Sequence, residues 1–365
     1  MTETVRIKKI TSRLVAVPLA EAIPNPFLGD RTQFASLMIE VHASNGATGF
    51  GYASIESVRM VRAVQCIIED LERLIKGKDP LCRSQIYETM WRATVDLLHD
   101  GAVNLALTAI DVALWDMGAK MANQPLWKYL GGFRDKQPLY ASWQLWRHQD
   151  SARWEKDAQA FVDAGHRAMK LRLGVTQSPA EDRAKAKLVR DVVGPNVALM
   201  VDALWGLTVN QGIRMAQMLG ELDYTWLEEP VREGDFAGLA QVRAAQAVPI
   251  AAGERISRFG QLKDLIPGIN HVILDAHHLG GITPWLRAAH YCESLNIPIS
   301  SHSHPFTHMH LLASNRCGAW VEYMPWWDPL FIDPPQPVKG CFEMSDKPGL
   351  GLTLNEKNLR KFTVK

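Results

Sequence analysis

Eight short apolar segments, separated by stretches with helical periodicity, run from about residue 138 to residue 325 and constrain the fold more than any other feature. They are residues 137–144, 166–173, 197–204, 224–230, 248–254, 271–278, 297–304 and 320–325. Alternating β and α segments predict a parallel sheet, because each helix returns the chain to the same edge. Eight such units are the number that closes a parallel sheet into a barrel. We therefore expect an α/β protein built on a TIM-type barrel.

The chain before the barrel has a different pattern. Residues 6–19 and 34–54 alternate in polarity like strands, with a hairpin turn at Asn45–Gly46. Apolar residues then recur with helical spacing between positions 105 and 117, in a segment that stops before Pro125. Strands followed by helices predict a separate α+β unit.

These patterns divide the chain into two domains. At 365 residues it exceeds a barrel of about 250 residues by about 100. We predict an α+β capping domain over residues 1–137 and a barrel over residues 138–335. The "DPPQP" stretch marks the exit from the barrel, and residues 336–365 are expected to run back and complete the cap.

Composition excludes several classes of partner. Charged residues make up 22% of the chain and the net charge is +1, so no overall charge favours nucleic acid or an anionic membrane surface. The N-terminus lacks an apolar signal core and no run of about 18 apolar residues occurs, so we expect a cytoplasmic protein without a membrane partner. The five cysteines are odd in number and lack CxxC spacing, which argues against a disulfide framework or a thiolate metal site.

Three consecutive apolar segments lead into a carboxylate. They supply Asp202, Glu228 and Glu254, and 26 residues separate each from the next. In a barrel of this kind the chemistry sits at the C-terminal ends of the strands. Three carboxylates at one mouth would repel each other, whereas a hard divalent cation relieves the repulsion. We predict a Mg²⁺ site, although each acid taken alone would be interpreted as a helix cap or a surface residue.

The next strand ends carry an acid and a base. The sixth segment leads to Asp275 and the seventh to His302. On adjacent strands, the carboxylate would hold one imidazole nitrogen and so fix the tautomer of a general base. The eighth segment holds Glu322, for which two roles stay open: a protonated carboxyl that donates to a developing enolate, or a carboxylate that pairs with a cation.

The stretch "AMKLRLG" sets two cations into an apolar strand. Lys170 and Arg172 are two residues apart, so both side chains point to one side of the strand. That side must therefore hold negative charge.

Six strand-end motifs occur in order: "KLR", "VDA", "EEP", "GE", "DAHHLGGIT" and "SSH". With them the chain resembles the enolase superfamily, mandelate racemase subgroup, from the "IDVALWD" helix to the closing "GLGL" segment. The resemblance implies a modified (β/α)₇β barrel whose eighth helix is displaced, with an N-terminal α+β capping domain. It also implies abstraction of the proton α to a carboxylate, through a metal-stabilised enediolate.

Carried over residue by residue, the resemblance implies these roles. The Mg²⁺ ligands are Asp202, Glu228 and Glu254, the acid/base dyad is Asp275 with His302, and Glu322 is the electrophilic carboxyl. Mg²⁺ and the strand-two cations Lys170 and Arg172 hold the substrate carboxylate. The family resemblance further implies a homo-oligomer, from dimers up to octamers.

One residue departs from the family's commoner Lys-x-Lys motif on this strand. Arg172 replaces the second lysine, which serves there as a base on the face opposite the histidine. A guanidinium stays protonated and is a poor base, although it grips carboxylates well. We therefore predict a one-base reaction, β-elimination of water from a sugar acid to a 2-keto-3-deoxy product. Lys170 as the opposite-face base, and with it a racemase, epimerase or lactone cycloisomerase, stays open as the alternative.

The predicted substrate is a mono- or dicarboxylic sugar acid, because the segments expected to cover the barrel mouth are polar. The candidate substrate contacts are Asn25, Arg31, Trp146, Arg147, His148 and His304. Two readings from other classes remain. Eight of the twelve histidines lie between residues 271 and 310, which admits a zinc hydrolase with an HxH pair, and a non-catalytic sugar-acid binder is the other.

Overall fold

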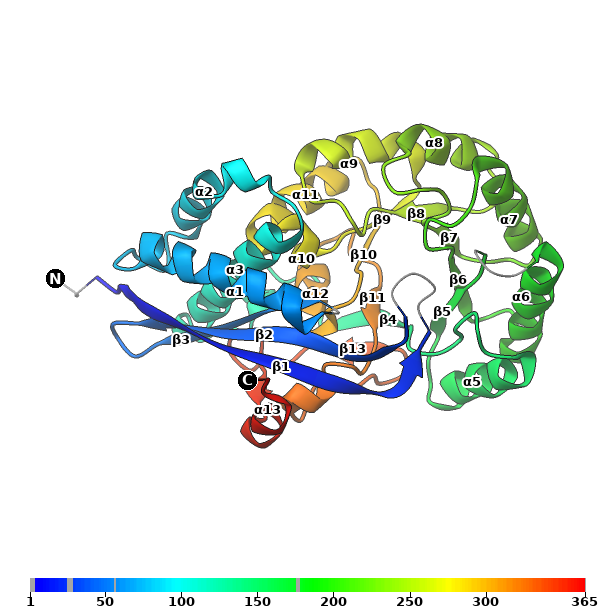
Figure 1. The fold of residues 1–365 in the computed structure, drawn as a ribbon. Helices are drawn as coiled ribbons and strands as arrows, with labels where there is room; N and C mark the ends of the chain where they lie inside the picture. The colour runs from blue at the N-terminus through cyan, green and yellow to red at the C-terminus, as the bar shows by residue number, and fades with distance from the viewer. Residues whose placement is uncertain (1–3, 25–28, 56, 175–177, 365) are drawn as a thin grey trace.

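The computed structural model describes residues 4–24, 29–55, 57–174 and 178–364. Each of the eight apolar segments supplies one barrel strand (Figure 1). The strands are β4 (Lys136–Ala141), β5 (Ala168–Arg172), β6 (Ala198–Asp202), β7 (Trp226–Glu228), β8 (Ile250–Ala252), β9 (His271–Ile273), β10 (Ile299–Ser300) and β11 (Val321–Tyr323). They pair in parallel in the order β10-β9-β8-β7-β6-β5-β4-β11. The expected barrel is confirmed.

The ring closes between β10 and β11 through an irregular segment. Ile299 N–H donates to Cys317 O at 2.8 Å, and Ala319 N–H donates to Ile299 O. Helices connect the strands around the outside (Figure 1). They are α5 (Ser151–Asp163), α6 (Pro179–Val193), α7 (Val209–Glu221), α8 (Phe236–Ala244), α9 (Phe259–Leu265), the 3₁₀ turn η2 (Ile266–Gly268), α10 (Ala276–Leu279), α11 (Ile282–Ser294) and α12 (Pro305–Ala313).

Strand alternation decides what fills the barrel. On β5, Met169, Leu171 and Leu173 join the apolar layer between sheet and helices. The opposite side chains point inward, where Ala168 belongs to a small apolar plug at the base of the barrel and Lys170 lies above it. The plug consists of Tyr140, Ala168, Met200, Trp226, Ala251 and Ile273. Because the base of the barrel is filled by apolar side chains, the polar side chains lie at the other end, where the strands have their C-termini.

The cap is a three-stranded antiparallel meander covered by helices. Its elements are β1 (Ile7–Ile23), β2 (Arg31–Ala43), β3 (Thr48–Ile55), α1 (Val58–Ile75), α2 (Arg83–Ala93), η1 (Val95–Leu97), α3 (Gly101–Met121) and α4 (Leu126–Tyr129). Helix α3 packs tightly on β3, where a Cβ atom on Gly49 or Gly51 would stand about 2 Å from a backbone oxygen of α3. Among described residues, only α3 is long and apolar enough to cross a membrane, and 89% of that apolar window is buried inside the protein.

Helix α3 also joins the cap to the barrel. Asn104 Nδ2 donates to His278 O at 2.7 Å, and Thr108 Oγ1 donates to His277 O at 3.0 Å. Asp111 accepts from Thr283 N–H and Thr283 Oγ1, both at 2.7 Å, at the start of α11. These bonds hold the segment that follows β9, which begins with Asp275.

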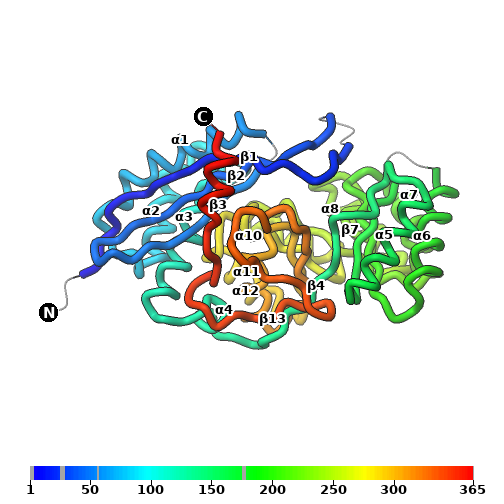
Figure 2. Tube along the Cα trace, turned by 90° about the horizontal axis from the view of Figure 1, so that it is seen from below, coloured from blue at the N-terminus to red at the C-terminus, as the bar shows by residue number. Residues whose placement is uncertain are grey.

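No eighth barrel helix follows β11 in the part of the chain that the structure describes. The chain continues through η3 (Asp328–Leu330), β12 (Phe331–Ile332), β13 (Cys341–Glu343), β14 (Thr353–Leu354) and α13 (Glu356–Phe362). Helix α13 lies beside β1, where Val364 N–H donates to Leu14 O (Figure 2). Strand β13 instead pairs with barrel strand β4. The prediction that residues 336–365 complete the cap therefore needs a correction: α13 joins the cap, whereas β13 belongs to the barrel.

Candidate active site

A cavity of about 320 Å³ opens at the C-terminal ends of the barrel strands. Ile23, Pro24 and Arg31 border it from the β1–β2 hairpin of the cap, which extends over the barrel mouth (Figure 1). Barrel residues form the remaining walls, and they include Lys170, Arg172, Asp202, Glu254, His302 and Glu322. Asp202, Glu254, His302 and Glu322 thus share one cavity, whereas Glu228 and Asp275 are buried and do not border it.

Sheet register places Arg172, Asp202 and Glu228 side by side. Arg172 on β5 pairs with Asp202 on β6, and Asp202 pairs with Glu228 on β7. Glu254 follows β8 two residues after the strand ends. All three carboxylates are buried. The predicted convergence of the acids at one mouth is confirmed.

These carboxylates repel each other, and one cation offsets part of the repulsion. Burial, Asp202 and Glu254 raise the pKa of Glu228 to about 7, although Lys170 lowers it. Lys170 Nζ lies 2.6 Å from Glu228 Oε1 and 3.9 Å from Asp202 Oδ2. Buried oxygen donors on three neighbouring strand ends fit the requirements of a hard divalent cation, whose two charges would relieve the remaining repulsion.

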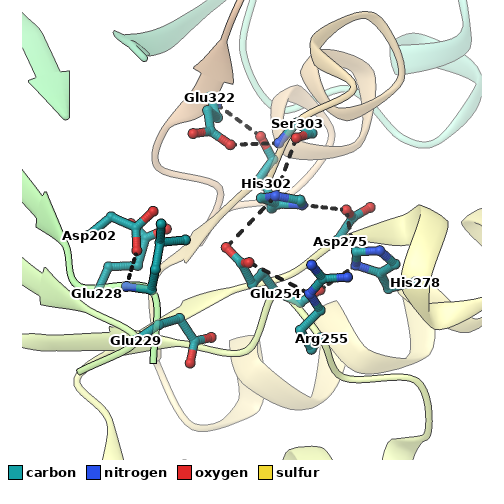
Figure 3. A network of polar contacts seen from close by, with 12 residues as sticks. Asp202, Glu228, Glu229, Glu254, Arg255, Asp275, His278, His302, Ser303 and Glu322 are labelled. Carbon is teal, nitrogen blue, oxygen red and sulfur yellow. Dashed lines mark hydrogen bonds and ion pairs between the residues drawn. The ribbon is translucent and has the colours of Figure 1, made fainter. Parts of the chain in front are cut away.

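Asp275 and His302 form the predicted dyad. His302 Nδ1 lies 2.8 Å from Asp275 Oδ2, while Nε2 lies 3.8 Å from Glu254 Oε2 and faces the cavity (Figure 3). Burial lowers the pKa of His302, but Glu254 and Asp275 outweigh burial and raise it to about 9. Because Nδ1 donates to the carboxylate, Nε2 is the nitrogen that exchanges a proton with a ligand.

The structure decides between the two roles left open for Glu322. Its Oε1 lies 2.6 Å from Ser142 Oγ and 2.9 Å from Lys170 Nζ, and its Oε2 accepts from Ser303 N–H at 2.7 Å. Burial opposes ionisation, but Lys170, His302 and Arg172 lower the pKa of Glu322 to about 2. The contacts of Glu322 therefore favour an ion-paired carboxylate, the second of the two roles left open by the sequence.

Family models match both domains of this chain. The model described as mandelate racemase / muconate lactonizing enzyme, N-terminal domain, matches residues 10–131, and the model described as enolase C-terminal domain-like matches residues 153–358. The chain belongs to the mandelate racemase and muconate lactonizing enzyme family. The resemblance inferred from the strand-end motifs is thereby confirmed.

Relatives of this family member span nearly its whole length. L-talarate/galactarate dehydratase from Salmonella typhimurium is 30% identical over 97% of this chain and 90% of its own. 3,6-anhydro-alpha-L-galactonate cycloisomerase from Streptomyces coelicolor is 28% identical over 98% and 99%. The crystal structure of L-talarate dehydratase from Polaromonas sp. JS666, complexed with Mg and L-glucarate, has a TM-score of 0.94 and 28% identity over 99% of this chain and 98% of that one.

The predicted substrate contacts divide into three groups. Arg31, Trp146, Arg147 and His148 border the cavity, as expected for residues of the loops above a family barrel. Asn25 lies outside the described residues. The sixth residue, His304, is placed elsewhere.

His304 does not border the cavity, so the structure does not bring it together with the other predicted substrate contacts. The backbone turns sharply at Ser303 and His304, whose φ angles are 49° and 45°. This turn sends the His304 ring against the cap, where it stacks on His277 with 3.5 Å between ring centroids and lies near Tyr52 and Trp327. The sequence alone could not reveal the direction of the His304 side chain, because the alternation of side chains along a strand no longer applies after the strand ends.

The histidines of the last three barrel units also do not form a zinc site of the HxH kind. His308 Nε2 accepts from Ala276 N–H, and His310 Nδ1 accepts from Trp127 N–H. Within the described residues, Asp275, His278 and His302 do bring one ligand atom each within 4.8 Å. These atoms already take part in hydrogen bonds. Nδ1 of His278 lies 2.7 Å from Glu254 O, and Nδ1 of His302 lies 2.8 Å from Asp275 Oδ2.

The sequence patterns did not single out several residues that lie near the site. Ser142 follows β4 and lies between Arg172 and Glu322, a strand-end position that the same logic should have flagged. Trp205 and Arg255 border the cavity next to Asp202 and Glu254. The second glutamate of "EEP", Glu229, points away from the cavity and accepts from Gly253 N–H at 2.7 Å, which ties the ends of β7 and β8 together (Figure 3).

We expect His271, His277 and His310 to lower the free energy of unfolding as the pH drops from about 6.5 toward 5, against an opposite contribution from Glu228 and Glu229, whose pKa values burial raises to about 7 and about 8. Burial lowers the pKa of His271 and His277 to about 3 and that of His310 to about 4. Below about pH 6.5 these histidines bind protons in the unfolded chain but not in the folded chain. Each of them therefore lowers the free energy of unfolding by about 2 kcal/mol at pH 5. Urea titrations between pH 7.5 and 5 measure the slope, which should be shallower for His271→Asn; an unchanged slope would contradict the assignment.

Proposed function

We propose that this protein is a Mg²⁺-dependent acid-sugar dehydratase. The carrying observation is a cavity lined by Asp202, Glu254 and His302, in which Asp202 lies beside Glu228 in the sheet and His302 Nδ1 is bonded to Asp275. Membership of a family whose relatives include named acid-sugar dehydratases supports the same conclusion. The reaction removes the proton α to the substrate carboxylate and then eliminates water across the α and β carbons.

Asp202, Glu228 and Glu254 would hold the cation. Bound there, Mg²⁺ would supply the positive charge that offsets the second negative charge developing on the substrate carboxylate as the α-proton leaves. Lys170 would remain between Glu228 and Glu322, where it keeps the deepest acids ionised. In this assignment Lys170 positions carboxylates rather than acting as a base, because the same acids hold its pKa well above the ordinary value in spite of burial.

His302 would remove the α-proton through Nε2. A cation held by Glu254 would offset the acidic charge that raises the pKa of His302 to about 9, and so leave the imidazole able to accept the proton. Asp275 accepts from Nδ1 and stabilises the imidazolium that results. Ser303 Oγ lies 3.3 Å from Nε2 and holds the ring from the side of Glu322. The imidazolium then has a proton to give to the departing β-hydroxyl, which leaves as water, so that one residue serves both steps.

Arg172 is the residue that favours elimination over racemisation. Its NH2 donates to Ser142 Oγ at 2.7 Å and its guanidinium stacks on Trp146 at 4.0 Å. A permanently charged group in this place polarises a carboxylate or hydroxyl but does not accept a proton. The opposite face of the enediolate is therefore left without a base.

The direct test is proton NMR in D₂O with Mg²⁺ over a library of mono- and dicarboxylic sugar acids and their lactones. We expect one α-proton signal to disappear together with the appearance of a 2-keto-3-deoxy product. Exchange without elimination, or isomerisation of a lactone, would instead assign the chain to the racemase or cycloisomerase class. The cycloisomerase relative, 28% identical over 98% of this chain, makes that the second candidate.

Replacing Arg172 by lysine should alter which face of the substrate exchanges. Lysine lacks the planar fork, so we expect kcat/KM for dehydration to fall about 10- to 100-fold, while deuterium is incorporated from both faces because a base is restored opposite His302. NMR of recovered substrate measures the second effect. Two-faced exchange already present in the unmodified protein would refute the one-base assignment.

We further propose that the enzyme acts in the cytoplasm as a homo-oligomer, between a dimer and an octamer, without a nucleic-acid or membrane partner. The net charge of +1 and the family membership support this. Light scattering coupled to size exclusion measures the assembly directly.

A further inference from the structure

The two dyad residues lie beyond the paired part of the barrel sheet. Strand β9 ends at Ile273, two residues before Asp275, and strand β10 ends at Ser300, two residues before His302. In the described part of the chain, the last backbone bond between these strand ends runs from Leu274 N–H to Ser300 O at 2.8 Å. Sheet pairing therefore does not by itself set the distance between the carboxylate and the imidazole.

One side chain of α12 joins the two loops that carry the dyad. His308 Nε2 accepts from the N–H of Ala276 at 2.9 Å, and this residue directly follows Asp275. His308 Nδ1 lies 2.9 Å from the carbonyl oxygen of Ser303, which directly follows His302. The His308 side chain is fully buried, so water does not compete for either bond. The imidazole of His308 thus spans the gap between the neighbours of the acid and the base.

These two bonds require one protonation state of His308. A backbone N–H always donates, so Nε2 presents its lone pair to Ala276 and Nδ1 carries the proton that is donated to Ser303 O. Burial favours this neutral form because it lowers the pKa of His308, although Asp275 opposes the shift. Nε2 also lies 3.5 Å from Asp275 Oδ1 but has no proton to donate there. The Asp275 carboxylate therefore keeps its negative charge for His302.

We propose that His308 is a positioning residue, which spaces the loops after β9 and β10 so that the Asp275 carboxylate and the His302 imidazole meet at bonding distance. His308 does not border the cavity, so it acts through the dyad rather than on the substrate. This inference rests on the proposed function, because the proton steps are assigned to the dyad there. A reacting group that is displaced by about 1 Å loses about 10²-fold in rate.

The same helix supplies a matched control. His310 is as deeply buried as His308, and its Nδ1 accepts from Trp127 N–H while its Nε2 lies 3.2 Å from Leu350 O. Neither of these partners borders the cavity. An asparagine at either position can keep the bond made through Nδ1 and loses the bond made through Nε2. His308→Asn and His310→Asn therefore each remove one buried bond to the backbone from α12.

The experiment compares kcat and KM of the Mg²⁺-loaded variants for α-proton exchange in D₂O, with the aldonate or aldarate that exchanges fastest in the NMR library. His308→Leu loses both bonds, whereas His308→Asn can keep the bond to Ser303 and His308→Gln the bond to Ala276. We expect kcat to fall about 100-fold in His308→Leu and about 10-fold in the other two, with KM within about threefold. His310→Asn should lose as much stability to urea as His308→Asn but keep kcat within about twofold.

Two results overturn the proposal: a loss of kcat in His310→Asn equal to that in His308→Asn, which means general damage to α12, and an undiminished kcat in His308→Leu. Exchange without elimination refutes the dehydratase assignment but leaves this comparison valid.

If no compound of the library exchanges, the proposed function fails, and crystal structures of the unmodified protein and of His308→Leu decide the role of His308. The proposal stands if the contact between His302 Nδ1 and Asp275 Oδ2 breaks in the variant, and it falls if the contact keeps its length of 2.8 Å. If His308→Leu does not fold, His308→Asn and His308→Gln take its place in both measurements.

Discussion

Replacing His302 by asparagine should lower kcat for the preferred sugar acid by about 10³-fold or more. Removal of a positioned general base usually costs 10²- to 10⁴-fold, and here the same imidazole is assigned both proton steps. Asp275 would lose its 2.8 Å partner but keep contacts with the neighbouring imidazoles of His278 and His308. The measurement is the rate of product formation alongside the rate of α-proton exchange in D₂O, and both should fall together.

The matched control is His290→Asn, which removes an exposed imidazole from α11. Its kinetics should equal those of the unmodified protein. Asp275→Asn should approach the loss seen for His302, because the two residues act as one unit. If His302→Asn kept a tenth of the original kcat while the fold stayed intact, another residue would have to be the base.

Changing Asp202 to asparagine should weaken Mg²⁺ binding by more than about 100-fold. Even residues that only support metal ligands cost 10- to 100-fold when mutated, and Asp202 is assigned direct contact. Activity at a fixed low Mg²⁺ concentration should fall in parallel and recover in part when Mg²⁺ is raised. Isothermal titration with Mg²⁺ gives the affinity without reference to substrate.

Glu233→Gln provides the comparison, because this exposed acid follows β7 outside the cavity. It changes the net charge by the same amount and should leave the Mg²⁺ affinity within about twofold. Unchanged affinity in Asp202→Asn would mean that the cation lies elsewhere, and the other two carboxylates would then need separate tests.

Sequence patterns anticipated those parts of the site that depend on strand ends. The 26-residue spacing from Asp202 to Glu228 and Glu254 reflects one βα unit per step; parallel pairing sets Asp202 level with Glu228, whereas Glu254 follows Ala251, the partner of Glu228, by three residues. The same logic places His302 beside Asp275, because β9 and β10 are adjacent. Periodicity and pairing are local rules, so they can be followed along the chain.

The residues that escaped prediction depend on contacts between distant segments. Glu322 was left between two roles because its partner Lys170 lies more than 150 positions earlier and reaches it across the barrel. His304 was misplaced because a left-handed turn one residue past the base redirects its ring toward the cap. Strand β13 escaped because more than 200 positions along the chain separate it from β4, the barrel strand with which it pairs. The positions of these residues depend on how distant segments pack together in the folded protein, which a local sequence pattern does not show.

The junction between α3 and the barrel has an evolutionary consequence. Asn104 and Thr108 contact main-chain carbonyls of residues 257, 277 and 278, and Asp111 accepts a backbone N–H at the start of α11. Main-chain groups are the same whatever side chain a residue carries. Side chains of the loop after β9 that do not face the cap can therefore change without losing these bonds, whereas Gly280 and Gly281 are fixed, because a Cβ atom there would lie 2.7 Å from Tyr87 Oη and 2.5 Å from Asp111 Oδ2. Side-chain changes in this loop and in the cap can therefore be made separately as long as these bonds and the two glycines are kept.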